Sequence, residues 1–463
     1  MDVFVDLMGQ VEMPKGGEPG GVRFFGKDPV MPTTFRIGEA AAAALALGAL
    51  NASAYHSIRS GKMQTIDVDT HLAAASLLGF FLQRLEGGEL KRPSLENPTV
   101  TFYPCKDGRW IHLHGGFPNL EEGLLQLLDC ERDTAAVAAK VTQWKAQDLE
   151  DEIAAQGLCA CMVRTRDEWL AHPQGQALAA KPLVEIEKIG DTAPFAEVAA
   201  GDVPDRPLSG IRVLDLTRVL AGPTCGRTLA SHGAQVLNVS AEHLPSVEPF
   251  VVDTGHGKRN TFLDFRQDAD RQKLDDLIQG ADVFCQSYRP GALAKYGLSP
   301  EQLIEKKPGL IVVSINCYGH DGPWDTRPGW EQLAQCATGI ADVEAKDGVP
   351  KLLPAAATDY TTGYLAALGA TIALLRRHRD GGSYHVKVSL ARTGMWLFDL
   401  GMVDGAGDVD FGAALEDVQS KMITTDSPFG RLVHLPPAVT MSDTPPRWDL
   451  PPAPLGAHAP EWV

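Results

Sequence analysis

Between residues 208 and 320, short runs rich in β-branched and apolar residues alternate with segments of helix length. The runs at 211–216, 235–239, 282–285 and 310–315 predict strands, and the segments at 268–279 and 300–306 predict helices. A further helical stretch begins at Gly222-Pro223 and ends at Gly233. Strands joined by helix-length connections form right-handed crossovers, so the pattern predicts a doubly wound, mainly parallel α/β sheet in a large, Rossmann-like domain.

The turn after the first predicted strand lacks the glycine pattern of dinucleotide-binding proteins. It reads TRVLAGPTCGR and contains no GxGxxG. A nucleotide at this end of the sheet would therefore be bound by groups other than that fingerprint.

Three segments interrupt the regular pattern. Residues 1–32 hold many Gly and Pro with little periodicity and predict a loose arm, and residues 190–208 form a polar, Pro-containing joint. Residues 436–463 are rich in Pro and are expected to run extended over a surface. At 463 residues the chain is too long for one ordinary core, so we expect two or three domains.

Residues 38–75 and 359–394 form an internal repeat. Gly48 pairs with Gly369 and Gly61 pairs with Gly382, both at an offset of 321 residues. Each copy predicts a helix, a basic Gly-containing turn, a strand and a second helix. The copies are too far apart for a solenoid, so a rearranged duplication is the simpler explanation.

The amino-acid composition and the net charge limit the classes of protein to which the chain could belong. A hydrophobic content of 44% and a charged content of 22% are typical of a folded protein. The net charge of −17 argues against nucleic acid or an anionic membrane as the main partner. No apolar run approaches the roughly 20 residues needed to cross a bilayer, and the first residues do not resemble a signal peptide. We therefore expect a cytoplasmic protein with no membrane partner.

Cysteine and histidine spacing gives no metal or redox motif. The eight Cys residues include no CxxC pair, so we expect reduced thiols. The 13 His residues show no HxxxH-type pairing, and no GxSxG is present. We expect no metal site.

Asp359 is the strongest candidate for covalent chemistry. It lies in the segment ATDYTTG at 357–363, directly before an Ala- and Leu-rich helix. One interpretation is that its carboxylate caps this helix. The other is that the helix dipole keeps the carboxylate ionised for use as an acyl carrier, and the two are compatible. The matching position in the first copy of the repeat is Gly38.

Five segments in the second half resemble the family III (CaiB/BaiF-type) CoA-transferases, in the order in which that family has them. They read LSGIRVLDLTRVLAGPTCGRTLASHGAQVLNV, GKRNTFLD, ADVFCQSYRPGALAKYG, YGHDGPWDTRPGWEQLAQCATG and DYTTG. The first half resembles the same family's small domain, through YPCKDGRWIH and VRTRDEWLAHPQ. Small-domain material therefore precedes the sheet domain, where the family has it afterwards.

The resemblance implies a division into six parts. These are an arm at 1–32, a degenerate helix-strand-helix repeat at 33–95, a small α+β domain at 96–190, a linker at 191–207, a large CoA-binding α/β domain at 208–400 and an extended tail at 401–463. It also implies an interlocked dimer, expected to be a homodimer or else part of a heteromer.

The resemblance also implies an activity and its residues. The protein would move CoA between an acyl-CoA and a carboxylic acid through an aspartyl intermediate on Asp359, with CoA as a substrate and no tightly bound cofactor. The family's CoA-binding positions carry over to Arg218, Ala221, Leu263, Ser287, Tyr288, Arg289 and Lys295. Basic residues among these, with Lys258 and Arg259, would supply the positive charge that a polyanion requires.

Two alternatives stay open. The family includes α-methylacyl-CoA racemases, which use a His where this chain has Trp330, and an indole cannot exchange a proton at carbon. The rearranged order, and Ser287 where the family usually has Asn, also fit an inactive homologue or one subunit of a heteromeric enzyme.

Overall fold

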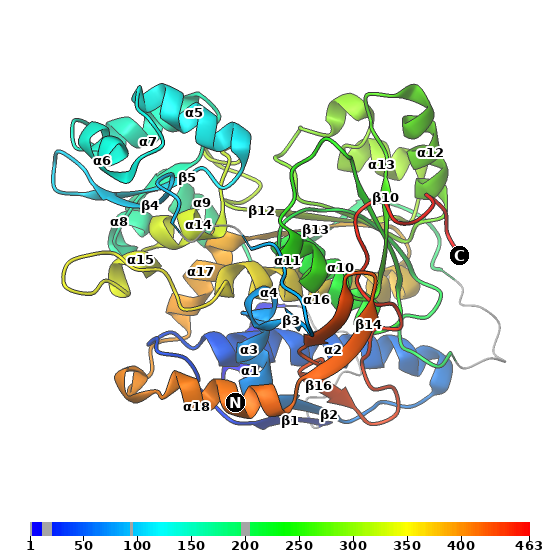
Figure 1. Ribbon diagram of the computed structural model, residues 1–463. Helices are drawn as coiled ribbons and strands as arrows, with labels where there is room; N and C mark the ends of the chain where they lie inside the picture. The colour runs from blue at the N-terminus through cyan, green and yellow to red at the C-terminus, as the bar shows by residue number, and fades with distance from the viewer. Residues whose placement is uncertain (1, 12–20, 93–95, 196–203) are drawn as a thin grey trace.

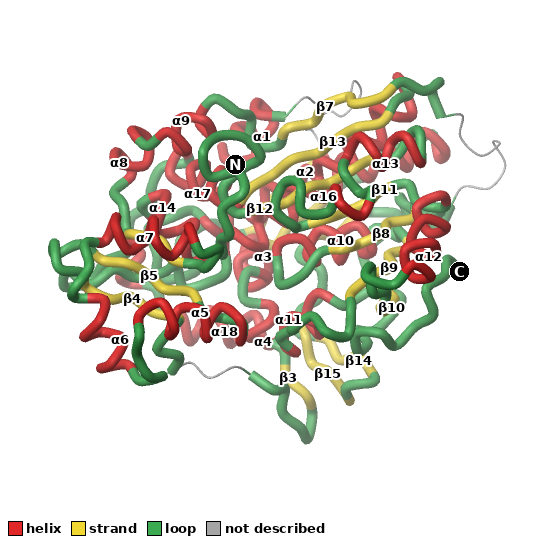
Figure 2. The backbone as a smooth tube through the Cα atoms, turned by 90° about the horizontal axis from the view of Figure 1, so that it is seen from above, coloured by secondary structure: helices red, strands yellow, loops and turns green. Residues whose placement is uncertain are grey.

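The computed structural model describes residues 2–11, 21–92, 96–195 and 204–463. Its main element is a seven-stranded sheet (Figure 2), parallel except for the last strand. The strand order is β10 (Lys258–Phe262), β9 (Gln235–Ser240), β8 (Arg212–Leu216), β11 (Val283–Gln286), β12 (Ile311–Asn316), β13 (Ser383–Ser389) and β7 (Glu185–Gly190). The predicted doubly wound, mainly parallel sheet is therefore confirmed.

The sequence pattern located most of these elements closely. The four predicted strands correspond to β8, β9, β11 and β12 to within one residue, and α12 (Asp268–Gln279) and α13 (Pro300–Lys306) have the predicted bounds. The predicted stretch after Gly222 is α10 (Ala221–Ser231). Strand β10 was not predicted, because its residues are mostly polar. Lys258, Asn260 and Thr261 are buried there all the same.

A smaller α+β unit lies beside the sheet (cyan in Figure 1). Strands β4 (Val100–Pro104), β5 (Trp110–His114) and β6 (Ala160–Met162) form its antiparallel sheet. Helices α5 (Pro118–Leu128), α6 (Thr134–Val141) and α7 (Ala146–Ala155) enclose a separate core with this sheet. Helices α8 (Arg166–Ala171) and α9 (Pro173–Ala179) lead on to β7, which leaves this unit and joins the large sheet. The predicted small domain is therefore wrong to include residues 185–190.

The internal repeat found in the sequence is also present in the structure. Helices α2 (Ile37–Ser60) and α16 (Ala357–Asp380) are both 24 residues long and pack against each other. In the first copy α2 is followed by β2 (Ile66–Asp69) and α3 (Thr70–Ser76), and in the second α16 is followed by β13 and α17 (Leu390–Asp399). Each copy therefore has the predicted helix-strand-helix order.

The two halves of the chain exchange strands. Strand β2 pairs in parallel with β1 (Val22–Phe25) and antiparallel with β16 (Val439–Met441), which comes from the C-terminal half. Its counterpart β13 pairs in parallel with β12 and antiparallel with β7, which comes from the N-terminal half. Each copy of the repeat thus receives its antiparallel strand from the other half, so the halves interlock.

The two ends of the chain hold more structure than predicted. The expected loose arm contains helix α1 (Asp2–Gln10), which buries Val3, Phe4 and Leu7, and strand β1. The expected extended tail contains α18 (Phe411–Ser420) and the hairpin of β14 (Ile423–Ser427) and β15 (Gly430–His434), which pairs with β3 (Arg84–Leu85). These helices and strands were not predicted because they are short and because the strands pair with distant parts of the chain. Residues 442–463 contain neither helix nor strand, in accord with their Pro content. Part of the predicted linker, 196–203, lies outside the described residues.

Helix α2 is long and apolar enough to cross a bilayer by length and composition, and 89% of its apolar window is buried inside the molecule. It therefore packs as a core helix of the fold. All eight Cys residues are free thiols.

Candidate active site

Asp359 lies in the first turn of α16 and is only 8% exposed. Its side chain forms no hydrogen bond or ion pair with another described residue, and burial raises its pKa from 3.8 to about 7. The expected helix cap is wrong, because the N-cap residue is Ala356 and no side chain caps the helix. The helix dipole was expected to keep the Asp359 carboxylate ionised, but the effect of burial is larger. Burial in apolar surroundings shifts the pKa of a carboxyl group more strongly than a helix dipole does.

A second buried carboxyl group, Glu331, accompanies Asp359. It is the first residue of α14 (Glu331–Thr338) and is 7% exposed. Its Oε1 accepts hydrogen bonds from the backbone N–H of Thr358 at 3.1 Å and from Gln335 Nε2 at 3.0 Å. Burial, and then the charge of Asp359, raise its pKa to about 8. Near neutral pH the pair therefore holds about one proton.

The face of α16 that carries Asp359 packs on the start of α10. Gly363 lies one turn after Asp359 on the same face, and a Cβ atom there would approach Ala221 O to 2.5 Å and Thr224 Cβ to 2.6 Å. Only glycine permits this approach. It brings Asp359 towards the N-terminus of α10, whose first residue is the predicted CoA-binding Ala221.

Four of the predicted CoA-binding residues cluster where the strand order of the sheet reverses, between β8 and β11. Arg218 follows β8, and its backbone N–H donates to Ser287 Oγ, which follows β11, at 3.2 Å. Tyr288 and Arg289 come next in the same loop. Ligands of open α/β sheets bind at the carboxyl ends of the strands at such a reversal. The fold therefore gathers Arg218, Ser287, Tyr288 and Arg289 at a suitable place.

Leu263 and Lys295 lie further out. Leu263 is buried directly after β10, and Lys295 is exposed with its Nζ 4.9 Å from the centre of the Tyr296 ring. Lys258 and Arg259 do not add free positive charge to this cluster. Lys258 is buried and pairs with Asp215 at 2.8 Å, and Arg259 lines a cavity at the opposite, amino-terminal end of the strands.

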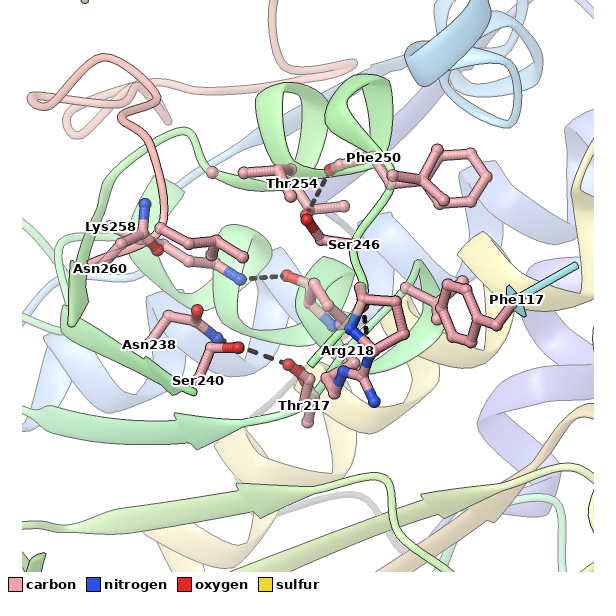
Figure 3. Close-up of a pocket in the computed structure, with 17 residues that line it drawn as sticks. Phe117, Thr217, Arg218, Asn238, Ser240, Ser246, Phe250, Thr254, Lys258 and Asn260 are labelled. Carbon is pink, nitrogen blue, oxygen red and sulfur yellow. Dashed lines mark hydrogen bonds between the residues drawn. The ribbon is translucent and has the colours of Figure 1, made fainter. Parts of the chain in front are cut away.

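A cleft of about 540 Å³, open solvent included, adjoins Arg218 (Figure 3). Arg218 and Phe117 lie at one end of it, and Lys258 and Asn260 lie at the other. The backbone bends sharply at this point, because the cleft residue Val219 has a φ of 72°, which β-branched residues rarely adopt. Such strain is often found where a loop is shaped for binding.

The small α+β unit contributes the aromatic side chain of Phe117 to the lining of the cleft. The Arg218 guanidinium lies 5.3 Å from the centre of the Phe117 ring, which precedes α5. The Phe117 ring in turn meets the Trp330 ring at 5.1 Å, and His114 stacks on Trp330 at 4.4 Å. Trp330 is the residue before Glu331. A continuous aromatic wall therefore leads from the cleft to the buried carboxyl pair.

In the first copy of the repeat the carboxylate is neutralised. Glu39 is the third residue of α2, and Asp359 is the third residue of α16. Asp359 therefore corresponds to Glu39 in the structure, and its predicted pairing with Gly38 is wrong by one residue. Glu39 Oε2 accepts from Arg36 Nε at 2.5 Å. Of the two positions, only the second copy holds a carboxylate without a cation partner.

Sequence reasoning missed Glu331, Phe117 and His114 as site residues. Glu331 lies in the fourth of the five motif segments, two residues after the RPG at 327–329, and this acidic residue was a usable signal. The positions of Phe117 and His114 depend on how the small unit docks, for which the sequence has no signal. Among the described residues, no group of three or more His, Cys, Asp or Glu side chains could hold a metal ion.

Comparisons with known proteins bear on the family of the chain. The model of "CoA-transferase family III" matches residues 8–200 and 208–426, one stretch in each half of the chain. An acyl-CoA transferase of Gibberella moniliformis is 33% identical over 327 residues, which cover 66% of this chain and 58% of that protein. A formyl-CoA:oxalate CoA-transferase of Rhodopseudomonas palustris is 33% identical over 198 residues, which cover 40% of this chain and 46% of that protein.

Among solved structures, a CAIB/BAIF family protein from Brucella suis is 27% identical, with 49% of this chain and 65% of that chain covered and a TM-score of 0.39. The chain spans little more than half the length of the first curated relatives that it matches. Because the family model matches most of its residues, in both halves, the chain belongs to CoA-transferase family III.

Proposed function

We propose that the protein is a CoA-transferase that moves CoA between an acyl-CoA thioester and a carboxylic acid, with Asp359 as the nucleophile. The observation that carries this proposal is the buried Asp359 carboxyl, which has no cation partner among the described residues and lies one turn before Gly363, where α16 packs on the start of α10. A carboxylate in water is a weak nucleophile, and its loss of solvation here makes it more reactive.

The reaction has four balanced steps. An Asp359 oxygen attacks the thioester carbonyl, CoA thiolate leaves, and an acyl-aspartyl anhydride forms. The thiolate attacks the aspartyl carbonyl of this anhydride and releases the donor carboxylate, which leaves an aspartyl-CoA thioester. The acceptor carboxylate displaces the thiolate to form a second anhydride. The thiolate then attacks the acceptor carbonyl, which yields the new acyl-CoA and restores Asp359. No net water, proton or electron is consumed.

The surrounding residues suit this sequence. Each step passes through an oxyanion, and the backbone N–H groups at the start of α10 are potential donors to it. Arg218, Arg289 and Lys295 provide the positive charge for the phosphates of CoA. The proton that Glu331 and Asp359 hold between them near neutral pH keeps a second negative charge out of the site when Asp359 reacts as the carboxylate. Anhydrides hydrolyse readily, so the low exposure of Asp359 protects the intermediate.

Trapping of the intermediate tests the proposal. The protein is incubated with a panel of dicarboxylate, aromatic and branched acyl-CoAs and then with hydroxylamine, and peptides are analysed by mass spectrometry. We expect a hydroxamate at Asp359, absent in Asp359→Asn and present in the matched control Asp404→Asn, whose side chain is exposed. CoA exchange that survives Asp359→Asn would refute the role of Asp359.

The racemase alternative gains one specific observation. Trp330 stands where racemases have a His, but His114 stacks on Trp330, and burial lowers the pKa of His114 to about 4. The imidazole is therefore neutral and is stacked on Trp330, the residue before Glu331, which favours a proton-accepting role. Incubation with a chiral 2-methylacyl-CoA in deuterated water separates the two activities. Deuterium at the α-carbon, lost in His114→Phe, would favour the racemase.

A further inference from the structure

Helix α16, which carries Asp359, begins without a side-chain cap. Its N-cap residue is Ala356, whose methyl group cannot accept from the free N–H groups of the first turn. Helix ends that lack a cap tend to fray. Ionised Asp359 is also better solvated in water than in its buried place, which favours opening of this turn. The first turn therefore needs support from outside the helix if Asp359 is to stay in the site.

The first half of the chain supplies such support at Leu77 and Phe80. Leu77 O accepts from the backbone N–H of Ala356 at 3.1 Å, three residues before the proposed nucleophile. The backbone N–H of Phe80, in α4 (Gly79–Leu82), donates to the hydroxyl of Tyr360 at 3.1 Å, one residue after the nucleophile. The two hydrogen bonds thus hold the chain on either side of Asp359.

Asp253, near the end of α11 (Glu248–Thr254), holds the Tyr360 hydroxyl as well. Tyr360 Oη donates to Asp253 Oδ2 at 2.7 Å, and Asp253 Oδ1 accepts from Arg227 Nη1 at 2.8 Å. All three side chains are buried. Hydrogen bonds to a charged group are stronger than neutral ones, and a buried network of this kind is rigid when all its members are satisfied. The Tyr360 hydroxyl is therefore fixed both as a donor and as an acceptor.

Helices α4, α11 and α16 lie side by side around this hydroxyl (Figure 1). The approach of α4 to α11 depends on Gly79, where a Cβ atom would come to 2.5 Å from Asp253 Oδ1. Helix α4 belongs to the first half of the chain, whereas α11 and α16 belong to the second. The first half therefore contributes to the placement of Asp359, although its own carboxylate at Glu39 is paired with Arg36.

We propose that Tyr360 is a positioning residue, which Asp253 and the N–H of Phe80 lock in place so that the first turn of α16 keeps Asp359 in the site. The effect on catalysis rests on the proposed function, but the effect on the placement of Asp359 does not. A misplacement of about 1 Å at a reacting group can cost roughly a hundredfold in rate, so such a lock matters for the reaction.

Tyr360→Phe tests the proposal, because it removes the hydroxyl and keeps the ring. The matched control is Tyr364→Phe, which removes another buried hydroxyl one turn further along α16, where Tyr364 Oη donates to Ser76 Oγ at 2.8 Å. Urea unfolding at pH 4 and pH 9 compares the midpoint of each variant with that of the wild type.

The two variants should respond differently to pH. In the wild type, burial raises the pKa of Asp359 to about 7, so the fold is strained once Asp359 ionises, and a loosened first turn would relieve this strain. The midpoint of Tyr360→Phe should lie below that of the wild type at pH 4, and the gap should shrink to half or less at pH 9. The gap for Tyr364→Phe should be the same at both pH values.

Kinetics of CoA transfer and hydroxylamine trapping, with succinyl-CoA, benzoyl-CoA and isobutyryl-CoA as donors, measure the effect on catalysis. In Tyr360→Phe, kcat and the labelling of Asp359 should fall at least about tenfold while KM stays within about twofold, and Tyr364→Phe should match the wild type. An equal gap at pH 4 and pH 9 in Tyr360→Phe, or a kcat equal to that of the wild type, overturns the inference. Absence of labelling in the wild type would instead count against the proposed nucleophile, and the urea comparison would still decide whether Tyr360 places Asp359.

Discussion

Replacement of the proposed nucleophile should make the protein more stable at high pH. Burial raises the pKa of Asp359 from 3.8 to about 7, so the folded chain keeps a proton that the unfolded chain releases between these values. The folded state therefore binds more protons in this window, and stability is lost as the pH rises through it. Asp359→Asn removes the titrating group and with it this loss.

The magnitude follows from the size of the shift. Each pKa unit corresponds to about 1.4 kcal/mol, so a rise from 3.8 to about 7 is equivalent to up to about 4 kcal/mol. We expect Asp359→Asn to match the wild type at pH 4 within about 1 kcal/mol and to exceed it by up to about 4 kcal/mol at pH 9. Because Asp359 is almost fully buried, salt should screen this difference only weakly.

Urea unfolding at pH 4, 6, 7.5 and 9 measures the difference directly. The control is Asp404→Asn, which makes the same chemical change on an exposed side chain and should give a pH-independent difference near zero. A constant difference between wild type and Asp359→Asn across the pH range would show that the carboxyl is not held in apolar surroundings. It would also remove the physical basis for its activation.

Three further changes test the packing around the site. Gly363→Ala should lower the free energy of unfolding by about 1–3 kcal/mol and reduce kcat, because the new Cβ atom would meet Ala221 O and push Asp359 away from α10. Urea titration measures the free energy of unfolding, and steady-state kinetics measure kcat. Lys258→Met should cost about 3–5 kcal/mol, since it leaves Asp215 charged and buried without a partner; equal stability of the variant by urea titration would contradict this. Val219→Asn should raise the free energy of unfolding by up to about 1 kcal/mol, because Asn tolerates the positive φ, and a lower melting temperature would argue against strain at this position.

The sheet was predictable where its strands are buried on both faces. Strands β8, β9, β11 and β12 are rich in buried apolar residues, which is typical of a covered parallel strand. Strand β10 escaped prediction because its buried Lys258 is stabilised by Asp215, 43 residues away. Strands β7 and β16 escaped because they pair with partners from the opposite half of the chain, and no local pattern encodes such pairing.

The residues of the candidate site could be predicted from the sequence, but the surroundings that set their pKa values and ion pairs could not. The resemblance to the family placed the residues from Arg218 to Lys295 and supported Asp359, and the roles of all these residues stay a prediction. The raised pKa of Asp359 depends on how tightly α16 packs on α10, which is a three-dimensional property. The structure was likewise needed to show that Asp215 neutralises the charge of Lys258, so that Lys258 adds no free positive charge to the site.

The strand exchange gives a physical reason for the unusual order of the domains. The small α+β unit precedes the sheet domain in the chain, yet β7 at its end pairs with β13 of the second half, and β16 returns to pair with β2 of the first. This reciprocal pairing holds Phe117 of the small unit against Arg218 of the sheet domain. One chain therefore brings together groups from both of its halves. Because the first copy neutralises Glu39 with Arg36, only the second of these two helix starts presents a carboxylate that has no cation partner among the described residues.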